Sequence, residues 1–119
     1  MAIDFTKALG VHPQALALRA RRTEVLASNI ANESTPGYQA RDVDFAQALS
    51  QVTDEDGGPA LDTDGALQWR VPFHARLDGN TVELGVEQAA FSQNVSDFQT
   101  SLTFVNMKLR GLAKAIEGQ

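Results

Sequence analysis

The sequence predicts a mainly α-helical chain in which two long terminal helices flank a polar middle. Three observations favour this class: an N-terminal segment of good helix formers, a C-terminal segment with unbroken apolar periodicity, and an acidic, turn-rich stretch between them. At 119 residues the chain forms one domain at most. Strand-like alternation occurs only in residues 67–84, so any sheet must be small.

The first helix is expected to begin near His12 or Pro13, because proline is well tolerated in a first turn. A kinked helix that starts at about Asp4 is the alternative. Apolar and small residues recur along it at steps of four and three, which predicts a packing surface. This N-terminal seam consists of Leu16, Ala20, Thr23, Ala27 and Ile30. A second apolar line beside it consists of Leu18, Val25 and Leu26.

The same helix is expected to end at about Ile30. Asn29 and Asn32 carry short amides that bond nearby backbone groups, and such residues favour helix ends. Pro36 then removes a backbone donor. Pro36 and Gly37 also fit the two central positions of a type II turn, where glycine supplies the positive φ.

The middle of the chain holds the net charge of −5, because both ends are neutral. Residues 51–84 contain seven acidic and two basic side chains, which argues against a nucleic-acid partner. A short amphipathic helix is expected at 43–49, followed by a polar linker. The alternation in 67–84, interrupted by the turn signal Asp78-Gly79-Asn80, predicts a small β-hairpin.

The C-terminal segment has the clearest periodicity, with apolar residues at alternating steps of four and three. This C-terminal seam consists of Phe91, Val95, Phe98, Leu102, Val105, Leu109, Leu112 and Ile116. A helix from about Glu87 to Ile116 would be roughly 45 Å long at about 1.5 Å per residue, longer than a domain of this size needs. The seam could belong to an intramolecular core, but we favour its use at least partly between subunits.

The stretch from Asn29 to Phe45 resembles the signature of the flagellar rod, hook and hook-filament axial proteins, and most of all their proximal rod branch. The residues that carry the resemblance are Asn29, Ile30, Ala31, Asn32, Thr35, Pro36, Gly37, Tyr38, Arg41, Asp42, Asp44 and Phe45. The resemblance extends to the preceding helix, to 69–72, to 77–82 and to the apolar pattern of the C-terminal seam. Only the region from about 51 to 67 has no counterpart.

The resemblance implies two long terminal helices packed as an antiparallel, coiled-coil-like pair, with an extended loop and a small β-hairpin between them. Residues 1–31 and 85–119 would form the helical axial core, and 32–84 would form the loop and the outward middle segment. The implied function is a structural subunit of the flagellar basal-body rod that stacks helically around the export channel. Its implied partners are other rod subunits, the adaptor at the membrane ring and the flagellar export apparatus.

The residues themselves indicate no enzyme. No nucleophile motif or phosphate-binding loop occurs, and no cofactor or metal is expected, because His12 and His74 lack ligand-spaced partners and cysteine is absent. Asp42 and Asp44 are interpreted as solvated loop residues or as partners of intersubunit salt bridges. The alternative function is a helical binding module, such as a secretion-associated chaperone or adaptor.

The sequence also bears on localisation. No apolar run approaches the roughly 20 residues that span a bilayer, and the N-terminus lacks the pattern of a cleaved signal peptide. Physical reasoning alone would favour the cytoplasm. The resemblance implies instead a place in the periplasmic rod of the basal body, reached by flagellar type III export without a cleaved signal.

Overall fold

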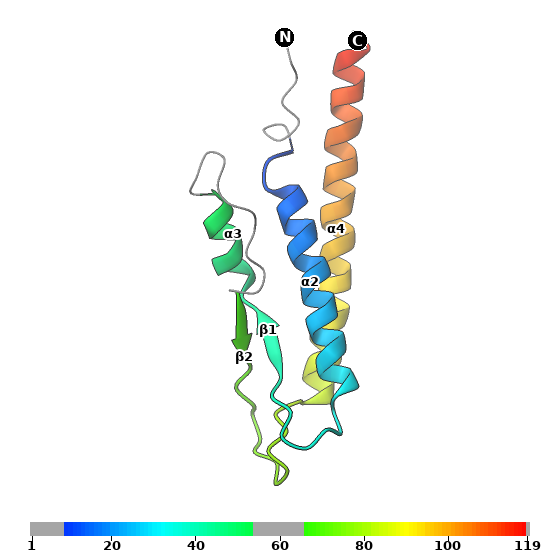
Figure 1. The fold of residues 1–119 in the computed structure, drawn as a ribbon. Coiled ribbons are helices and arrows are strands. Elements are labelled where there is room, and N and C mark those ends of the chain that lie inside the picture. The colour runs from blue at the N-terminus through cyan, green and yellow to red at the C-terminus, as the bar shows by residue number, and fades with distance from the viewer. Residues whose placement is uncertain (1–8, 54–65, 119) are drawn as a thin grey trace.

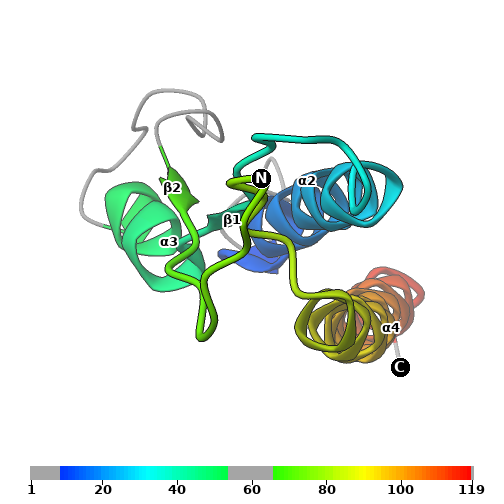
Figure 2. The ribbon, with the colours of Figure 1, turned by 90° about the horizontal axis from the view of Figure 1, so that it is seen from below.

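The structure is a computed structural model that describes residues 9–53 and 66–118. It is elongated, with extents of 65 × 26 × 18 Å (Figure 1). A small two-stranded sheet and a short helix pack on one side of a pair of long helices (Figure 2). In chain order the elements are α2 (His12–Ala31), β1 (Arg41–Val43), α3 (Phe45–Thr53), β2 (Leu67–Trp69) and α4 (Leu84–Ile116).

The two long helices form an antiparallel pair, as expected (Figure 1). Asn29 near the end of α2 contacts Glu87 near the start of α4, whereas the ring of His12 stacks on that of Phe104 with centroids 6.0 Å apart. From Phe104 to Ile116, α4 therefore continues beyond the level at which α2 begins. Seen from below, α2 lies between α4 and the layer formed by the sheet and α3 (Figure 2).

The start of α2 agrees with the first of the two expectations. The helix begins at His12 with Pro13 in its first turn, after Gly10 with a positive φ of 62°. The alternative start near Asp4 lies outside the described residues. At the other end α2 stops at Ala31, and the Asn32 amide donates to Ser28 O at 2.8 Å. This contact confirms the helix-end role expected of Asn32.

The turn after α2 has the geometry expected of Pro36 and Gly37. Gly37 has a φ of 73°, and Tyr38 N donates to Thr35 O at 3.2 Å across the turn. Gly37 N also donates to Asp78 O at 2.8 Å. A residue with a Cβ avoids this φ region, so the turn itself requires glycine.

Replacing this glycine should destabilise the fold, whereas the same change inside α4 should not. We expect Gly37→Ala to lower the free energy of unfolding by about 1 kcal/mol through backbone strain alone, because a Cβ there meets no atom within 4 Å. The matched control is Gly111→Ala, where an added Cβ also meets no atom within 4 Å. This change should raise the free energy of unfolding by up to about 1 kcal/mol, because alanine favours a helix more than glycine does. Urea titration of both variants tests this. Equal changes in both would contradict the backbone argument.

The expected small sheet is confirmed, but the hairpin expected within residues 67–84 is wrong. β2 pairs antiparallel with β1, with Arg41 opposite Trp69 and Val43 opposite Leu67. Residues 82–83 are not a strand, and α4 begins at Leu84. The turn at Asp78–Asn80 is real, but it directs the chain alongside residues 37–40, where Thr81 N donates to Tyr38 O at 2.9 Å.

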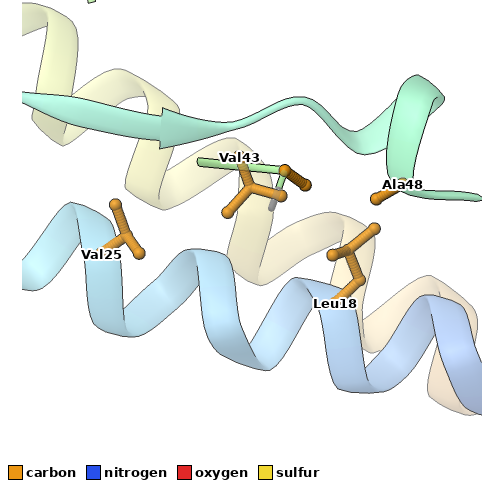
Figure 3. Packing of buried hydrophobic residues seen from close by; sticks show 5 residues of the cluster. Leu18, Val25, Val43 and Ala48 are labelled. Carbon is orange, nitrogen blue, oxygen red and sulfur yellow. The ribbon is translucent and has the colours of Figure 1, made fainter. Parts of the chain in front are cut away.

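The short helix α3 confirms the amphipathic helix expected at 43–49. Asp44 caps it, because its Oδ1 accepts the N–H of Gln47 at 3.1 Å. The apolar core lies between α2, β1 and α3 (Figure 3). Its buried members are Leu18, Val25, Val43, Ala48 and Ala66, with Phe45 and Leu67 packed against them. On α2 this core uses the second apolar line, and Ala20 and Ala27 of the N-terminal seam are exposed.

Candidate functional site

Asn29 is fully buried and connects three elements. Its Nδ2 donates to Arg41 O at 2.6 Å and to Glu87 Oε2 at 2.9 Å, and its Oδ1 accepts Arg41 N at 3.2 Å. The Tyr38 hydroxyl lies 3.4 Å from the same Oδ1. Asn29 lies near the end of α2, as expected, but its side chain bonds Arg41 in β1 and Glu87 in α4 rather than the backbone of its own helix end. Its side chain holds β1 and α4 against α2, because β1 presents the backbone of Arg41 to it and α4 presents the carboxylate of Glu87.

Four charged side chains complete a polar cluster around this amide. The Arg22 guanidinium makes two hydrogen bonds to Asp42, at 2.9 and 3.1 Å. Arg70 lies 2.8 Å from Asp42 and 2.7 Å from the fully buried carboxylate of Glu87. Two cations thus neutralise two anions, which is the condition for keeping charges away from water. We call Arg22, Asn29, Asp42, Arg70 and Glu87 the polar cluster.

The polar cluster corrects the interpretation of Asp42. This residue is neither solvated nor left for a neighbouring subunit, because Arg22 and Arg70 pair with it inside the chain. Asp44 also has intramolecular partners, as the cap of α3 and as an acceptor for the Gln68 amide at 3.4 Å. Sequence reasoning missed the roles of Arg70 and Glu87, since their partners lie far along the chain.

The surroundings of Asp42 determine how its charge responds to pH. Burial alone would raise the pKa of the Asp42 carboxyl, but the hydrogen bonds and charge of Arg22, with Val43 N–H and Arg70, outweigh it. The net result is a pKa below the usual 3.8. Hydrogen bonding to Asp42 likewise raises the pKa of the Arg22 guanidinium above its usual value.

The lowered pKa of Asp42 predicts sensitivity to acid. A carboxyl with a lower pKa in the folded state contributes stability above its unfolded pKa, and this contribution is lost as the pH falls through the folded pKa. We therefore expect the free energy of unfolding to fall below about pH 4, less steeply in Asp42→Asn. At pH 7 that variant should lose about 2–3 kcal/mol, because Arg22 loses the carboxylate that pairs with it in the polar cluster and Arg70 loses one of its two. Urea titration across pH measures both effects.

Asp44→Asn is the matched control for this experiment, since asparagine caps a helix as well as aspartate does. It should lose much less stability at pH 7 than Asp42→Asn. If the two variants lose the same amount, the ion pairs of Asp42 contribute nothing specific.

Asn80 joins two stretches that are far apart in the sequence. This buried amide donates to Asn32 O at 2.9 Å, Glu33 O at 3.0 Å and Thr35 O at 2.7 Å, and its Oδ1 accepts Val82 N at 2.7 Å. It thereby satisfies carbonyl groups at the end of α2 and ties the turn to the segment that enters α4. Sequence reasoning named Asn80 only as a turn residue.

The C-terminal seam is largely exposed along the face of α4. Phe91, Phe98, Val105 and Leu112 are half-buried, whereas Val95, Leu102, Leu109 and Ile116 are exposed. Leu102 and Leu109 each expose 42% of their surface, and Ile116 exposes 59%. In the N-terminal seam Leu16, Thr23 and Ile30 are half-buried, so neither seam is enclosed within the part of the chain that the structure describes.

A second group of exposed apolar side chains lies on the segment that contains β2. They are Trp69, Val71, Phe73 and Leu77. The apolar alternation in this segment predicted a strand, but it does not say whether the apolar side chains are covered by other parts of the protein. Trp69 packs only against the guanidinium of Arg41, 5.3 Å from its ring centroid, among the ring contacts described.

Within 9–53 and 66–118, no three His, Cys, Asp or Glu side chains lie together where they could hold a metal ion. Among the helices of the same ranges, none is long and apolar enough to cross a membrane. The acidic runs at 54–56 and 62–64 lie outside the described residues.

Comparison with known proteins places these features in a family. Residues 9–39 match the family model described as flagella basal body rod protein. The whole chain is 44% identical to the flagellar basal body rod protein FlgB of Aeromonas hydrophila, covering 100% of this chain and 99% of the relative. FlgB of Cereibacter sphaeroides is 43% identical over 97% of this chain and 98% of its own. FlgB of Salmonella typhimurium is 40% identical over 93% of this chain and 94% of its own length. These relatives give no support to the chaperone or adaptor alternative.

Proposed function

The chain belongs to the flagellar basal body rod protein family, and from this premise we propose that it forms the proximal part of the rod by stacking helically with further copies. As a member of this family it is a structural subunit of the basal body rod, where it associates with other rod subunits. The proposed role is mechanical, as part of the drive shaft and of the wall of the export channel, without catalysis or a cofactor.

The observation that carries this proposal is the uncovered apolar face of α4. The helix has 33 residues, or roughly 50 Å, against 20 residues in its partner α2. Beyond Phe104 it still presents large apolar side chains such as Leu109 and Ile116 to solvent. Exposed apolar surface of this extent marks an interaction site, and identical neighbouring copies supply helices with matching seams.

The seams define how the subunit would be oriented in the rod. Residues 1–31 and 85–119 would form the axial core around the channel, with the C-terminal seam and the N-terminal seam facing neighbouring copies. Residues 32–84, which carry most of the acidic side chains, would face outward. In the periplasm the partners would be other rod subunits and the adaptor at the membrane ring, after passage through the export apparatus without cleavage of a signal.

Purified basal bodies test the position and the role together. Antibody labelling should mark this protein at the membrane-proximal end of the rod, and deletion of its gene should leave basal bodies without a rod. A version that carries Ser92→Leu, an exposed position off the seams, should restore the rods and serves as a control for complementation. Label at the distal end, or complete rods in the deletion strain, would refute the proposed position.

A further inference from the structure

The face of α4 that is fully buried against α2 is polar. Glu87 and Asn94, seven residues apart, each have no exposed surface, whereas Val95 and Leu102 of the C-terminal seam, which lie alongside α2, are 36% and 42% exposed. The intramolecular helix contact therefore does not use the most apolar line of the helix. That line lies to one side, half-covered, while polar groups occupy the centre of the contact.

Asn94 makes contacts that hold at one register only. Its Nδ2 donates to Arg19 O at 2.9 Å and lies 2.8 Å from the hydroxyl of Thr23, which itself donates to Arg19 O at 3.0 Å. Its Oδ1 accepts no hydrogen bond from any described residue. A buried amide with one end unpaired costs stability relative to an apolar side chain, so stability alone does not account for asparagine at this position.

Glu87 repeats this arrangement one heptad earlier. Its carboxylate accepts the Asn29 amide at 2.9 Å and pairs with Arg70 at 2.7 Å. Further along, Asp97 pairs with Arg19 at 3.2 Å. Shifting α4 along α2 by a turn would leave Glu87 charged, buried and without these partners.

We propose that Asn94, together with Glu87, selects an α2 helix rather than a second α4 as the partner of this face of α4 and sets the register of the two helices, so that the apolar seams stay free for other copies. The inference rests on the proposed function, because only an assembly of many identical helices needs such a selection. An apolar seam with an even heptad repeat pairs at several registers and with any matching helix. A single polar position inside such a contact specifies one partner and one register.

The inference can be tested on purified protein by cross-linking, since the chain contains no cysteine. His12→Cys and Phe104→Cys introduce two thiols at side chains that stack at 6.0 Å in the folded chain. A short bis-maleimide should join them within one chain, which runs as a cross-linked monomer on a denaturing gel. In the background of Asn94→Leu we expect a several-fold rise in interchain product, because the apolar contact then also accepts the α4 of another copy.

Two further variants make the result decisive. Thr23→Val removes the hydroxyl that Asn94 contacts. It should also raise the amount of interchain product, but by less than Asn94→Leu does. Ser92→Leu adds the same leucine at an exposed position of α4 and should change nothing. Unchanged products with Asn94→Leu, or an equal rise with Ser92→Leu, would overturn the inference. Neither outcome concerns the place of the protein in the basal body, which the labelling experiment tests by itself.

Discussion

Leu102→Glu is expected to abolish rod assembly, and with it motility, while the protein is still made and delivered. Leu102 lies near the middle of the C-terminal seam, with seam residues on both sides, so no fraying end can relieve a charge there. Burying an unpaired carboxylate between copies costs on the order of several kcal/mol. In the monomer the side chain is 42% exposed, and the new carboxylate stays in water.

Thr103→Glu is the matched control, because this neighbouring residue is exposed and lies off the seam. It introduces the same charge on the same helix and should be much milder. Swimming in soft agar and electron microscopy of basal bodies measure assembly, and circular dichroism of the purified variants checks that both still form helix. Normal rods with Leu102→Glu, or equal damage from Thr103→Glu, would mean that the seam is not the assembly surface.

Asn29→Ala is expected to cause the largest loss of stability among single changes in the family motif. The substitution removes the bonds to Arg41 and leaves Glu87 with one partner fewer in a site without water contact. Unpaired buried groups of this kind cost about 3 kcal/mol in total. Because Asn29 joins α2 to both β1 and α4, the sheet and the helix pair should both lose stability. Urea titration followed by helix signal and by tryptophan fluorescence from Trp69 measures the two effects.

Asn32→Ala is the control within the same motif. The Asn32 side chain is half-buried, and its partners among the described residues are Ser28 O and the hydroxyl of Thr35, both close in the chain. Its loss should cost about 0.5–1.5 kcal/mol, the ordinary value for one hydrogen bond. Similar losses for the two asparagines would show that the motif acts only as a helix end.

Much of the fold follows from local pattern. The start of α2 at His12, the turn at Pro36 and Gly37, and the helix that carries the C-terminal seam all depend on residues within a few positions of one another. Propensity, proline geometry and heptad spacing act over that range. The predictions for these elements are accordingly confirmed.

The polar cluster could not be predicted from local pattern. Arg22, Asp42 and Glu87 look like ordinary surface charges in the sequence, and nothing local marks them as partners. The strand Leu67–Trp69 was expected, but its pairing with Arg41–Val43 was not, because three-residue strands carry too little pattern to specify a partner. Such pairings depend on contacts across the chain, which bring together groups that the sequence keeps apart.

The sequence by itself determined the helices, their ends, the acidic middle and the family signature, because each is a property of neighbouring residues. The tertiary structure alone decided which face of each helix is buried. Apolar periodicity marks Leu102 as a packing position without saying against which helix it packs, whereas Glu87 and Asn94 occupy the centre of the contact with α2. The reason is that α2 supplies hydrogen-bond partners for these two residues, and a buried polar group is stable only where such partners meet it.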